Sequence, residues 1–459
     1  MADDSFSPLI AEALPQLQHQ FAALPTGSTA SGWPDDPAAI SAVLAEVSSR
    51  MANNYPYFHP LYAGQMMKPP HPIARAAYAM AMWINPNNHS LDGGRASSRF
   101  EVEAVAEIAA MFGWEQHLGH LTGGGTVANL EALWVAGQLH PGKRIVASSQ
   151  AHYTHSRLSG VLGLRFSPIA VDQRGRMDLG RLEEELRQGD VGTVVATLGT
   201  TAIGSVDPLD RIVALREKYG FRLHVDAAYG GYFKLVPGIS PEAVRAFAAI
   251  GEADSIVIDP HKHGLQPYGC GCVLFHDPAV GSFYKHDSPY TYFSSADLHL
   301  GEITLECSRA GAAAVALWAT QRLMPLAPDG EFARGLGRCR EAASRMFRRL
   351  ECDEKFVTAF QPELDILFWG VKASSVADAS RLAQAIFDEA AKRDLHLALA
   401  QLPIGLFPEA SWPDAASHST VTCLRSVLMK PEHLDWVDRI WEILIAASEA
   451  CMLESRETS

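Results

Sequence analysis

Apolar and polar residues follow two different spacings through the middle of the chain. Short, nearly continuous apolar runs, such as residues 193–197 and 255–258, are typical of strands buried on both faces. Segments with apolar residues three and four positions apart lie between several of these runs, as in residues 123–139, and this spacing is typical of helices. The alternation predicts an α/β fold with a mainly parallel sheet and helices on both of its faces.

The sequence LAPDG at residues 326–330 interrupts this pattern. Beyond it, the spacing predicts a helix, a strand, a helix, a strand and a final helix, which together form a smaller α+β domain. We therefore expect three parts: an N-terminal segment (1–55) that packs on a partner subunit, a large domain (56–325) and a small C-terminal domain (326–459).

Composition narrows the class of protein. A net charge of −14 argues against a nucleic-acid binder and gives no support for an anionic membrane surface as partner. No run reaches the roughly 18 apolar residues of a membrane span, and the N-terminus lacks the basic and apolar regions of a secretory signal. Seven cysteines, an odd number without CxxC spacing, predict reduced thiols. We expect a soluble, cytoplasmic protein.

Four places at the ends of apolar runs carry groups that are suited to catalysis or ligand binding. In an open α/β sheet, ligands bind at the carboxyl ends of the strands. The glycine-rich turn 123–126 opens a helix, while His152, Asp226 and Lys262 each follow an apolar run. Taken singly, each has an ordinary structural interpretation: a turn, a core histidine, a capping aspartate and a surface lysine.

Lys262 stands between two apolar runs in the sequence DPHKHG. Burial would lower its pKa from about 10.4 and make the neutral amine available for Schiff-base chemistry. Asp226, in HVDAAYGG, could face a cationic ring nitrogen, and Ala228 leaves room for a flat ring. His152 and His155 resemble half of a zinc site, but no third ligand has a suitable spacing, so we expect no metal.

The glycine-rich turn suits a phosphate, because backbone N–H groups and the positive end of a helix dipole meet there. It lacks the GK[ST] ending of a nucleotide P-loop and does not fit GxGxxG. The four places together supply a phosphate cradle, a stacking imidazole, a carboxylate and an amine. This combination predicts pyridoxal 5'-phosphate as the cofactor.

The motifs TGGGTVANL, SSQAHYTHS, TLGTTAIGSVDPL, HVDAAYGG and DPHKHG occur in this order along the chain. In order and spacing they resemble the group II pyridoxal-phosphate-dependent amino-acid decarboxylases, which include the aromatic-amino-acid, glutamate, histidine and tyrosine decarboxylases. The resemblance covers roughly residues 55–325 and, more weakly, 424–433. It implies the fold of the aspartate-aminotransferase-like (fold type I) transferases, with a seven-stranded sheet in the large domain, and a homodimer.

The resemblance also implies roles for individual positions. Lys262 would bind the cofactor covalently, His152 would stack on its ring, Asp226 would hold the ring nitrogen protonated, and Ala228 would contact the ring. Phosphate and neighbouring contacts would come from the matching motifs, at Gly124, Gly125, Thr126, Thr200, Asp259 and His261. Arg425 would meet the substrate carboxylate, and Tyr290 or Tyr292 would return a proton to the substrate.

The reaction implied is decarboxylation of an L-amino acid to CO₂ and a primary amine. Arg95 could pair with an acidic side chain of an Asp- or Glu-like substrate, whereas aromatic residues near 55–62 and 290–293 suit a tyrosine-like one. The sequence ECSRAGAAAVALW (306–318) resembles tyrosine decarboxylases and sphingosine-phosphate lyases. A carbon–carbon lyase, an aldehyde synthase, an aminotransferase, a non-catalytic cofactor-binding subunit and a nucleotide-binding domain are the alternatives.

Overall fold

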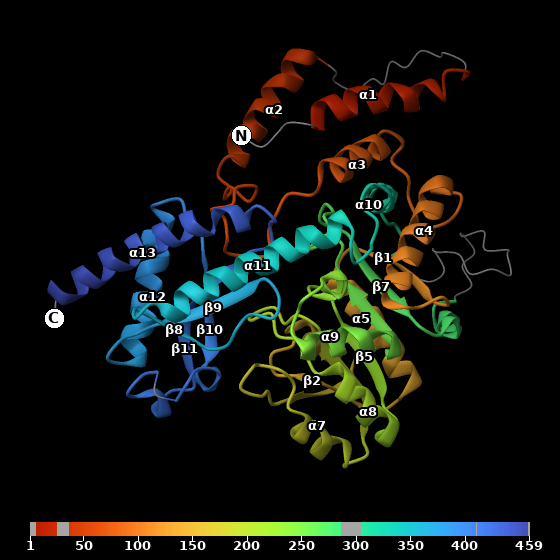
Figure 1. Ribbon diagram of the computed structural model, residues 1–459. Coiled ribbons are helices and arrows are strands. Elements are labelled where there is room, and N and C mark those ends of the chain that lie inside the picture. The colour runs from red at the N-terminus through yellow and green to blue at the C-terminus, as the bar shows by residue number, and fades with distance from the viewer. Residues whose placement is uncertain (1–5, 25–35, 286–303, 410, 458–459) are drawn as a thin grey trace.

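The computed structural model describes residues 6–24, 36–285, 304–409 and 411–457 (Figure 1). The chain forms a large domain around one sheet and a smaller C-terminal domain around another, and helix α11 (Glu331–Cys352) lies along both (Figure 1). Within the described ranges, no helix is both long enough and apolar enough to cross a membrane.

A seven-stranded sheet with the order β1-β7-β6-β5-β4-β2-β3 forms the centre of the large domain. Strands β3, β2, β4, β5 and β6 pair in parallel, whereas β7 pairs antiparallel with both β6 and β1. The mainly parallel sheet predicted from the apolar runs is confirmed. The strands are β1 (Leu118–Thr122), β2 (Arg144–Ser148), β3 (Arg165–Ile169), β4 (Val191–Thr197), β5 (Arg222–Asp226), β6 (Ser255–Ile258) and β7 (Gly271–Phe275).

Helices cover both faces of this sheet, as β6 illustrates. Ile256 and Ile258 belong to an apolar cluster with Ile108 of α4, whereas Val257 packs in another cluster with Ala132 of α5. Successive side chains of a strand point to opposite faces, so a strand buried on both sides is apolar throughout. The helices are α4 (Arg95–Phe112), α5 (Gly125–Leu139), α6 (Thr154–Val161), α7 (Leu179–Leu186), α8 (Leu209–Tyr219), α9 (Pro241–Ala248) and α10 (Gly311–Leu323).

The small domain is an antiparallel sheet with the order β10-β11-β9-β8, covered by helices. Residues 61–63, which the sequence assigns to the large domain, lie here: Tyr62 bridges to His396, and Val427 donates its N–H to the carbonyl of Ala63. The domain boundaries therefore stay a prediction. The elements are β8 (Phe356–Thr358), β9 (Ile366–Val371), β10 (Ala398–Pro403), β11 (Thr420–Val427), α12 (Val376–Ala391) and α13 (His433–Glu457).

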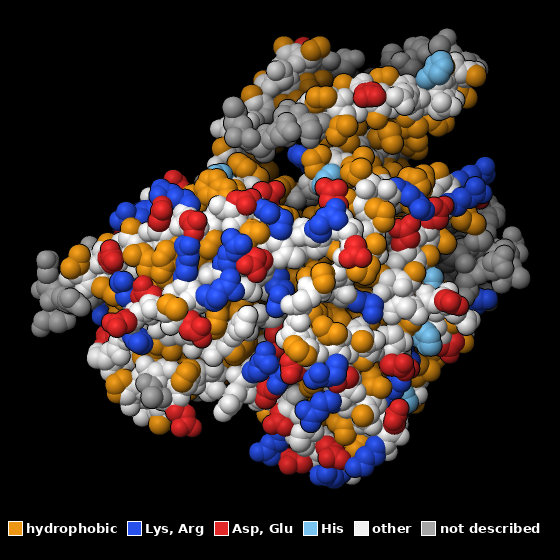
Figure 2. All heavy atoms as spheres, viewed as in Figure 1, with side chains coloured by type: hydrophobic (Ala, Val, Ile, Leu, Met, Phe, Trp, Pro, Cys, Tyr) orange, Lys and Arg blue, Asp and Glu red, His pale blue; other side chains and the backbone are white. Residues whose placement is uncertain are grey.

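The N-terminal helices project from the large domain (Figure 1). Helix α1 (Phe6–His19) packs on α3 (Pro72–Ile84), whereas α2 (Pro37–Met51) has no buried residue. Four apolar side chains at helical spacing on α2 are 47 to 60% exposed: Ile40, Val43, Leu44 and Val47. Figure 2 shows apolar side chains gathered over these projecting helices. An apolar stripe of this kind marks a surface suited to packing against another protein surface.

Candidate active site

A cavity of about 400 Å³ opens at the carboxyl ends of β4, β5 and β6, beside the start of helix α5. Parallel strands end on the same edge of the sheet, which brings together residues far apart in sequence. The lining includes the glycine-rich turn and most of the positions that the sequence predicts: Gly124, Gly125, Thr126, His152, Asp226, Ala228, Asp259, His261 and Lys262.

Lys262 follows β6 in a connection that returns as β7, the strand next to it. Its Nζ lies 3.0 Å from Oδ2 of Asp259. Burial lowers the pKa of Lys262, but the carboxylates of Asp259 and Asp226 outweigh this effect, so its net pKa lies above the ordinary value for lysine. The lowered pKa expected from burial alone is therefore wrong, because the sequence motif did not reveal that both carboxylates face the amine.

Asp226 ends β5 and is buried. Its Oδ2 lies 2.8 Å from Nε2 of His155, and its Oδ1 accepts the N–H of Ala228 at 3.1 Å. Burial raises the pKa of Asp226, but the hydrogen bond and charge of His155, together with the Lys262 ammonium, lower it to well below the usual range for aspartate. Asp226 is thus an ionised carboxylate at the floor of the cavity.

His155 was not recognised as a site residue from the sequence. It lies in the first turn of α6 and is fully buried. The spacing of His152 and His155 suggested half of a metal site, but Nε2 of His155 is directed to Asp226. No local sequence signal identified this role, because His155 and Asp226 lie 71 positions apart and their pairing depends on the tertiary fold.

His152 lies just before α6 and lines the cavity. Its Nδ1 contacts the hydroxyl of Thr154 and accepts the N–H of Thr154 at 3.3 Å. Burial lowers the pKa of His152, with the charges of Asp226 and Lys262 acting in opposite directions. The ring is therefore a neutral imidazole at neutral pH, as a flat packing partner for another ring requires.

The glycine-rich turn has no room for side chains on the cavity side. Gly124 has φ of 150°, and a Cβ on Gly125 would lie 2.6 Å from Oδ2 of Asp259. Nε2 of His261 lies 3.6 Å from the same Asp259 oxygen, and burial lowers the pKa of His261. Within the described part of the chain, Nδ1 of His261 has no hydrogen-bond partner. This buried unpaired nitrogen and the backbone N–H groups beginning α5 fit a phosphate group.

Thr200 and Arg425 lie beside the cavity without being part of its lining as the structure describes it. Thr200 is buried in the turn after β4, where its hydroxyl accepts the N–H of Ser205 at 3.0 Å. Arg425 is also buried, and its Nη2 and Nε donate to the carbonyls of Thr201 and Ala202 at 2.6 and 2.7 Å. Arg425 thus supports the turn that carries Thr201, a residue of the cavity wall.

In the described structure, Arg95 does not line this cavity. Its side chain is 83% exposed and lies 3.4 Å from Asp92. It is the first residue of α4, and the buried face of that helix begins with Ser97 and Ser98. Tyr290 and Tyr292, the two candidate proton donors, lie outside the described residues.

A buried cluster connects the cavity to the small domain, and it accounts for His263. Tyr229, in the cavity wall, donates its hydroxyl to Oδ1 of Asp365 at 2.6 Å. Nε2 of His263 lies 3.2 Å from the other oxygen of Asp365. Burial raises the pKa of Tyr229, and the adjacent Asp365 carboxylate raises it further, so this tyrosine stays a phenol. No local motif around Asp365 signals this contact.

Comparison with known proteins agrees with this arrangement. The model of the pyridoxal-dependent decarboxylase conserved domain matches residues 134–370, more than half of the chain. An L-tyrosine decarboxylase of Enterococcus faecium is 29% identical over 77% of this chain and 76% of its own length. A probable L-tyrosine/L-aspartate decarboxylase of Methanothrix thermoacetophila is 30% identical over 67% of this chain and 76% of its own length.

Among solved structures, the Oryza sativa TDC with PLP and tryptamine superimposes with a TM-score of 0.78, at 18% identity, over 98% of this chain and 95% of that one. This similarity confirms the predicted fold of the pyridoxal-phosphate-dependent decarboxylases. The matching domain and the relatives together show that the chain belongs to the pyridoxal-dependent decarboxylase family and is a carboxy-lyase that uses pyridoxal phosphate.

Proposed function

We propose that this enzyme decarboxylates an aromatic L-amino acid, tyrosine or a close analogue, to CO₂ and a primary amine. The observation that carries the proposal is that Lys262 and the ionised carboxylate of Asp226 line the same cavity. The amine provides a covalent attachment point, and the carboxylate provides a fixed negative charge for a protonated ring nitrogen. The two relatives named above are, by name, tyrosine and tyrosine/aspartate decarboxylases.

Each residue of the cavity has a role in this proposal. Lys262 binds the cofactor covalently, Asp226 keeps the ring nitrogen protonated, and His152 packs on the ring as a neutral imidazole. The phosphate group is held by the backbone of Gly124 and Gly125 with Thr126 and His261. Bound pyridoxal phosphate supplies an electron sink for the electron pair left on the substrate when CO₂ departs. His155 acts through Asp226, because it keeps that carboxylate ionised.

The charges around the cavity favour an aromatic over an acidic substrate. An acidic substrate carries a second carboxylate on its side chain, and this group, when buried, needs a cation of its own as partner. Arg95 lies at the surface beside Asp92, and Arg425 already donates to backbone carbonyls. Tyr153 and Tyr229 line the cavity instead. An acidic, aspartate-like substrate is the second candidate, supported by the name of the Methanothrix relative.

We also propose a homodimer located in the cytoplasm. The exposed apolar stripe on α2, at Ile40, Val43, Leu44 and Val47, supports packing of the N-terminal helices on a second subunit. The seven cysteines are an odd number without CxxC spacing, which supports a reducing compartment. Sedimentation or light scattering of the purified enzyme measures its mass in solution and so tests the proposed homodimer.

The decisive experiment is incubation of the purified enzyme and pyridoxal phosphate with each L-amino acid, with CO₂ and amine measured together. We expect tyrosine to give CO₂ and tyramine in equal amounts, and Lys262→Ala to give neither. Turnover of aspartate alone would support the second candidate. An aldehyde in place of the amine would indicate an aldehyde synthase. In a separate incubation, cleavage of a phosphorylated amino alcohol without CO₂ would indicate a carbon–carbon lyase. Cofactor binding without turnover would indicate a non-catalytic subunit.

A further inference from the structure

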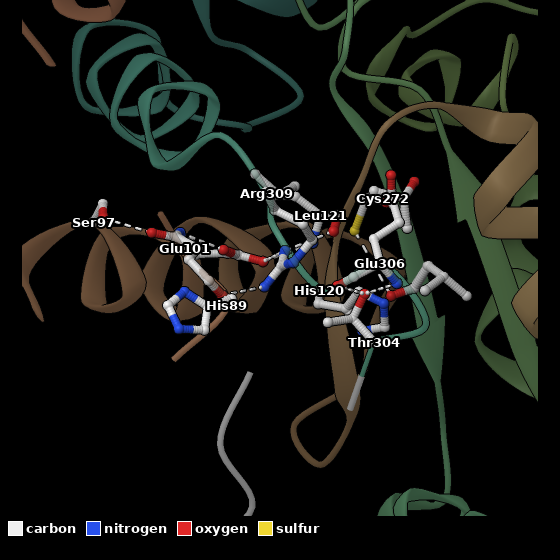
Figure 3. Close-up of polar contacts among 12 residues, drawn as sticks. His89, Ser97, Glu101, His120, Leu121, Cys272, Thr304, Glu306 and Arg309 are labelled. Atoms are coloured by element: carbon white, nitrogen blue, oxygen red, sulfur yellow. Dashed lines mark hydrogen bonds and ion pairs between the residues drawn. The ribbon is translucent and has the colours of Figure 1, made fainter. Parts of the chain in front are cut away.

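A carboxylate approaches the glycine-rich turn from outside the cavity. Oε2 of Glu306 accepts the N–H of Gly123 at 2.8 Å (Figure 3). Its Oε1 lies 2.9 Å from the point that a Cβ on Gly123 would occupy. Gly123 lines the same cavity as Gly124, Gly125 and Thr126. An anion therefore already contacts the first N–H of the turn to which the phosphate group of the cofactor is assigned.

The fold holds Glu306 in this place through its neighbours in sequence. The N–H of Glu306 donates to Oγ1 of Thr304 at 3.1 Å. Three residues further on, Nη1 of Arg309 lies 2.5 Å from Oε1 of Glu101 and donates to the carbonyl of Leu121 at 2.8 Å (Figure 3). Leu121 belongs to β1, the strand that runs directly into the glycine-rich turn. Segment 304–309 and the turn are thus fixed to the same strand.

No cation of the described residues 6–24, 36–285, 304–409 and 411–457 compensates the charge of Glu306. Arg309, the nearest arginine in sequence, forms its ion pair with Glu101. Among the residues that the structure describes, no lysine, arginine or histidine forms an ion pair with Glu306. Asp259, the other carboxylate beside the turn, has Lys262 at 3.0 Å. Within the described part of the chain, Glu306 therefore contributes a negative charge without an ion-pair partner, beside the place where a group of charge about −2 is expected to bind.

We propose that Glu306 sets the affinity for pyridoxal phosphate by opposing its phosphate group. The carboxylate and the phosphate repel each other and compete for backbone N–H groups of one turn, so Glu306 weakens cofactor binding and speeds cofactor release. This inference rests on the proposed phosphate site. It adds a residue that acts on the phosphate end and leaves the reacting end of the cofactor untouched.

The test compares cofactor binding by the wild-type enzyme and by Glu306→Gln, freed of cofactor and titrated with pyridoxal phosphate while absorbance is followed. Glutamine keeps the acceptor oxygen for the N–H of Gly123 but carries no charge. We expect the dissociation constant to fall about threefold to tenfold at low ionic strength, and by less at high salt. Pyridoxal, which lacks the phosphate, should bind the two proteins equally.

Glu115→Gln is the control for net charge, because it also removes one negative charge, in this case from an exposed side chain, whereas Glu306 is partly buried. Glu115 precedes the start of β1, whereas Gly123 follows its end, about 17 Å away along the strand. If Glu115→Gln lowered the dissociation constant for pyridoxal phosphate as much as Glu306→Gln, the inference would be overturned, since net charge alone would then explain the effect.

Two other outcomes would also overturn it. Equal affinity of wild type and Glu306→Gln for pyridoxal phosphate would show that Glu306 only orders the turn. If Glu306→Gln bound both pyridoxal and pyridoxal phosphate more tightly than the wild type, the effect would not involve the phosphate. Failure of the wild-type enzyme to bind pyridoxal phosphate at all would instead refute the proposed site, and the inference with it.

Discussion

The imidazole of His155 and the carboxylate of Asp226 meet at 2.8 Å, and both side chains are buried. The two residues come from different elements, α6 and β5. A buried carboxylate is costly unless hydrogen bonds and a countercharge stabilise it. His155 contributes to both, so the ionised state of Asp226 depends on a residue that lines no part of the cavity as the structure describes it.

Replacing His155 tests this dependence. We expect His155→Leu to lower kcat/KM about tenfold to a hundredfold, because Asp226 loses a charge-assisted hydrogen bond worth about 1.5–3 kcal/mol and its pKa rises. His155→Gln, whose amide can still donate to Asp226, should retain more activity. Steady-state kinetics from pH 5 to 9 measure both effects. Equal kinetics and equal pH profiles for wild type and His155→Leu would contradict the positioning role.

The raised pKa of Lys262 makes cofactor capture depend on pH. The amine is protonated at neutral pH and must lose its proton to react, so the rate of capture should increase as pH rises from 6 to 9. Asp259→Asn removes the carboxylate 3.0 Å from Nζ, which lowers the pKa of the amine and moves the profile to lower pH. Stopped-flow absorbance of pyridoxal phosphate binding measures the profile. A profile unchanged in Asp259→Asn would contradict the assignment of the raised pKa to Asp259.

Lys262→Ala should abolish the covalent link to the cofactor, and Lys262→Arg should do the same while keeping a cation beside Asp259. Borohydride reduction followed by mass spectrometry detects the link as a stable mass increase on the peptide containing residue 262. Reduction that still attaches the cofactor to either variant would show that another amine binds it.

Gly125→Ala tests the tight approach of the glycine-rich turn to Asp259. The new Cβ would lie 2.6 Å from Oδ2 of Asp259, so we expect a destabilisation of about 1–3 kcal/mol together with weaker cofactor binding. Gly160→Ala in α6 is the matched control, since no atom lies within 4 Å of its Cβ position. This control should be neutral or stabilising by up to about 1 kcal/mol. Denaturant unfolding distinguishes the two, and equal stability of the variants would refute the steric argument.

His224 makes the stability of the protein sensitive to acid. Its Nε2 lies 2.8 Å from Oδ1 of Asn129 and its Nδ1 lies 2.9 Å from Oγ of Ser255, and burial lowers its pKa to about 3. The unfolded chain takes up a proton near pH 6.5, whereas the folded protein does not. The contribution of the neutral ring is therefore complete above pH 6.5 and is lost as pH falls toward 3.

Between pH 7.5 and 5.0, this residue should cost the wild-type protein about 2 kcal/mol of its free energy of unfolding. Urea unfolding at the two pH values measures the loss, and His224→Gln should show a smaller one. Asp226, with its lowered pKa, adds to the acid sensitivity only below about pH 4. An identical pH dependence in the His224→Gln variant would rule out His224 as its source.

The apolar runs predicted the sheet and the place of the site, because a strand buried on both faces and the residue at its end are visible in local sequence. Lys262, Asp226 and the glycine-rich turn were located in this way, and the structure brings them to one cavity. The pKa values of these side chains could not be predicted from local sequence. The raised pKa of Lys262 depends on two carboxylates, one of them on another strand.

Contacts between elements that are distant in sequence could not be predicted from local sequence patterns either. His155 with Asp226, and His263 with Asp365, join residues whose separation in sequence follows no spacing rule. The contacts of Arg425 were likewise not visible in the local sequence. Its motif predicts a substrate ligand, which stays a prediction, and its buried guanidinium donates to the carbonyls of Thr201 and Ala202.

The antiparallel course of β7 has a consequence for how the lysine segment opens. Because β7 lies directly beside β6, with Ile258 opposite Cys272, both ends of the segment that carries Lys262 are fastened by the same ladder of main-chain hydrogen bonds. The next pairs on either side, to β5 and β1, place this ladder inside the sheet and not at its edge. Amide hydrogen exchange at Ile258 and Cys272 should therefore proceed only through unfolding of the large domain as a whole.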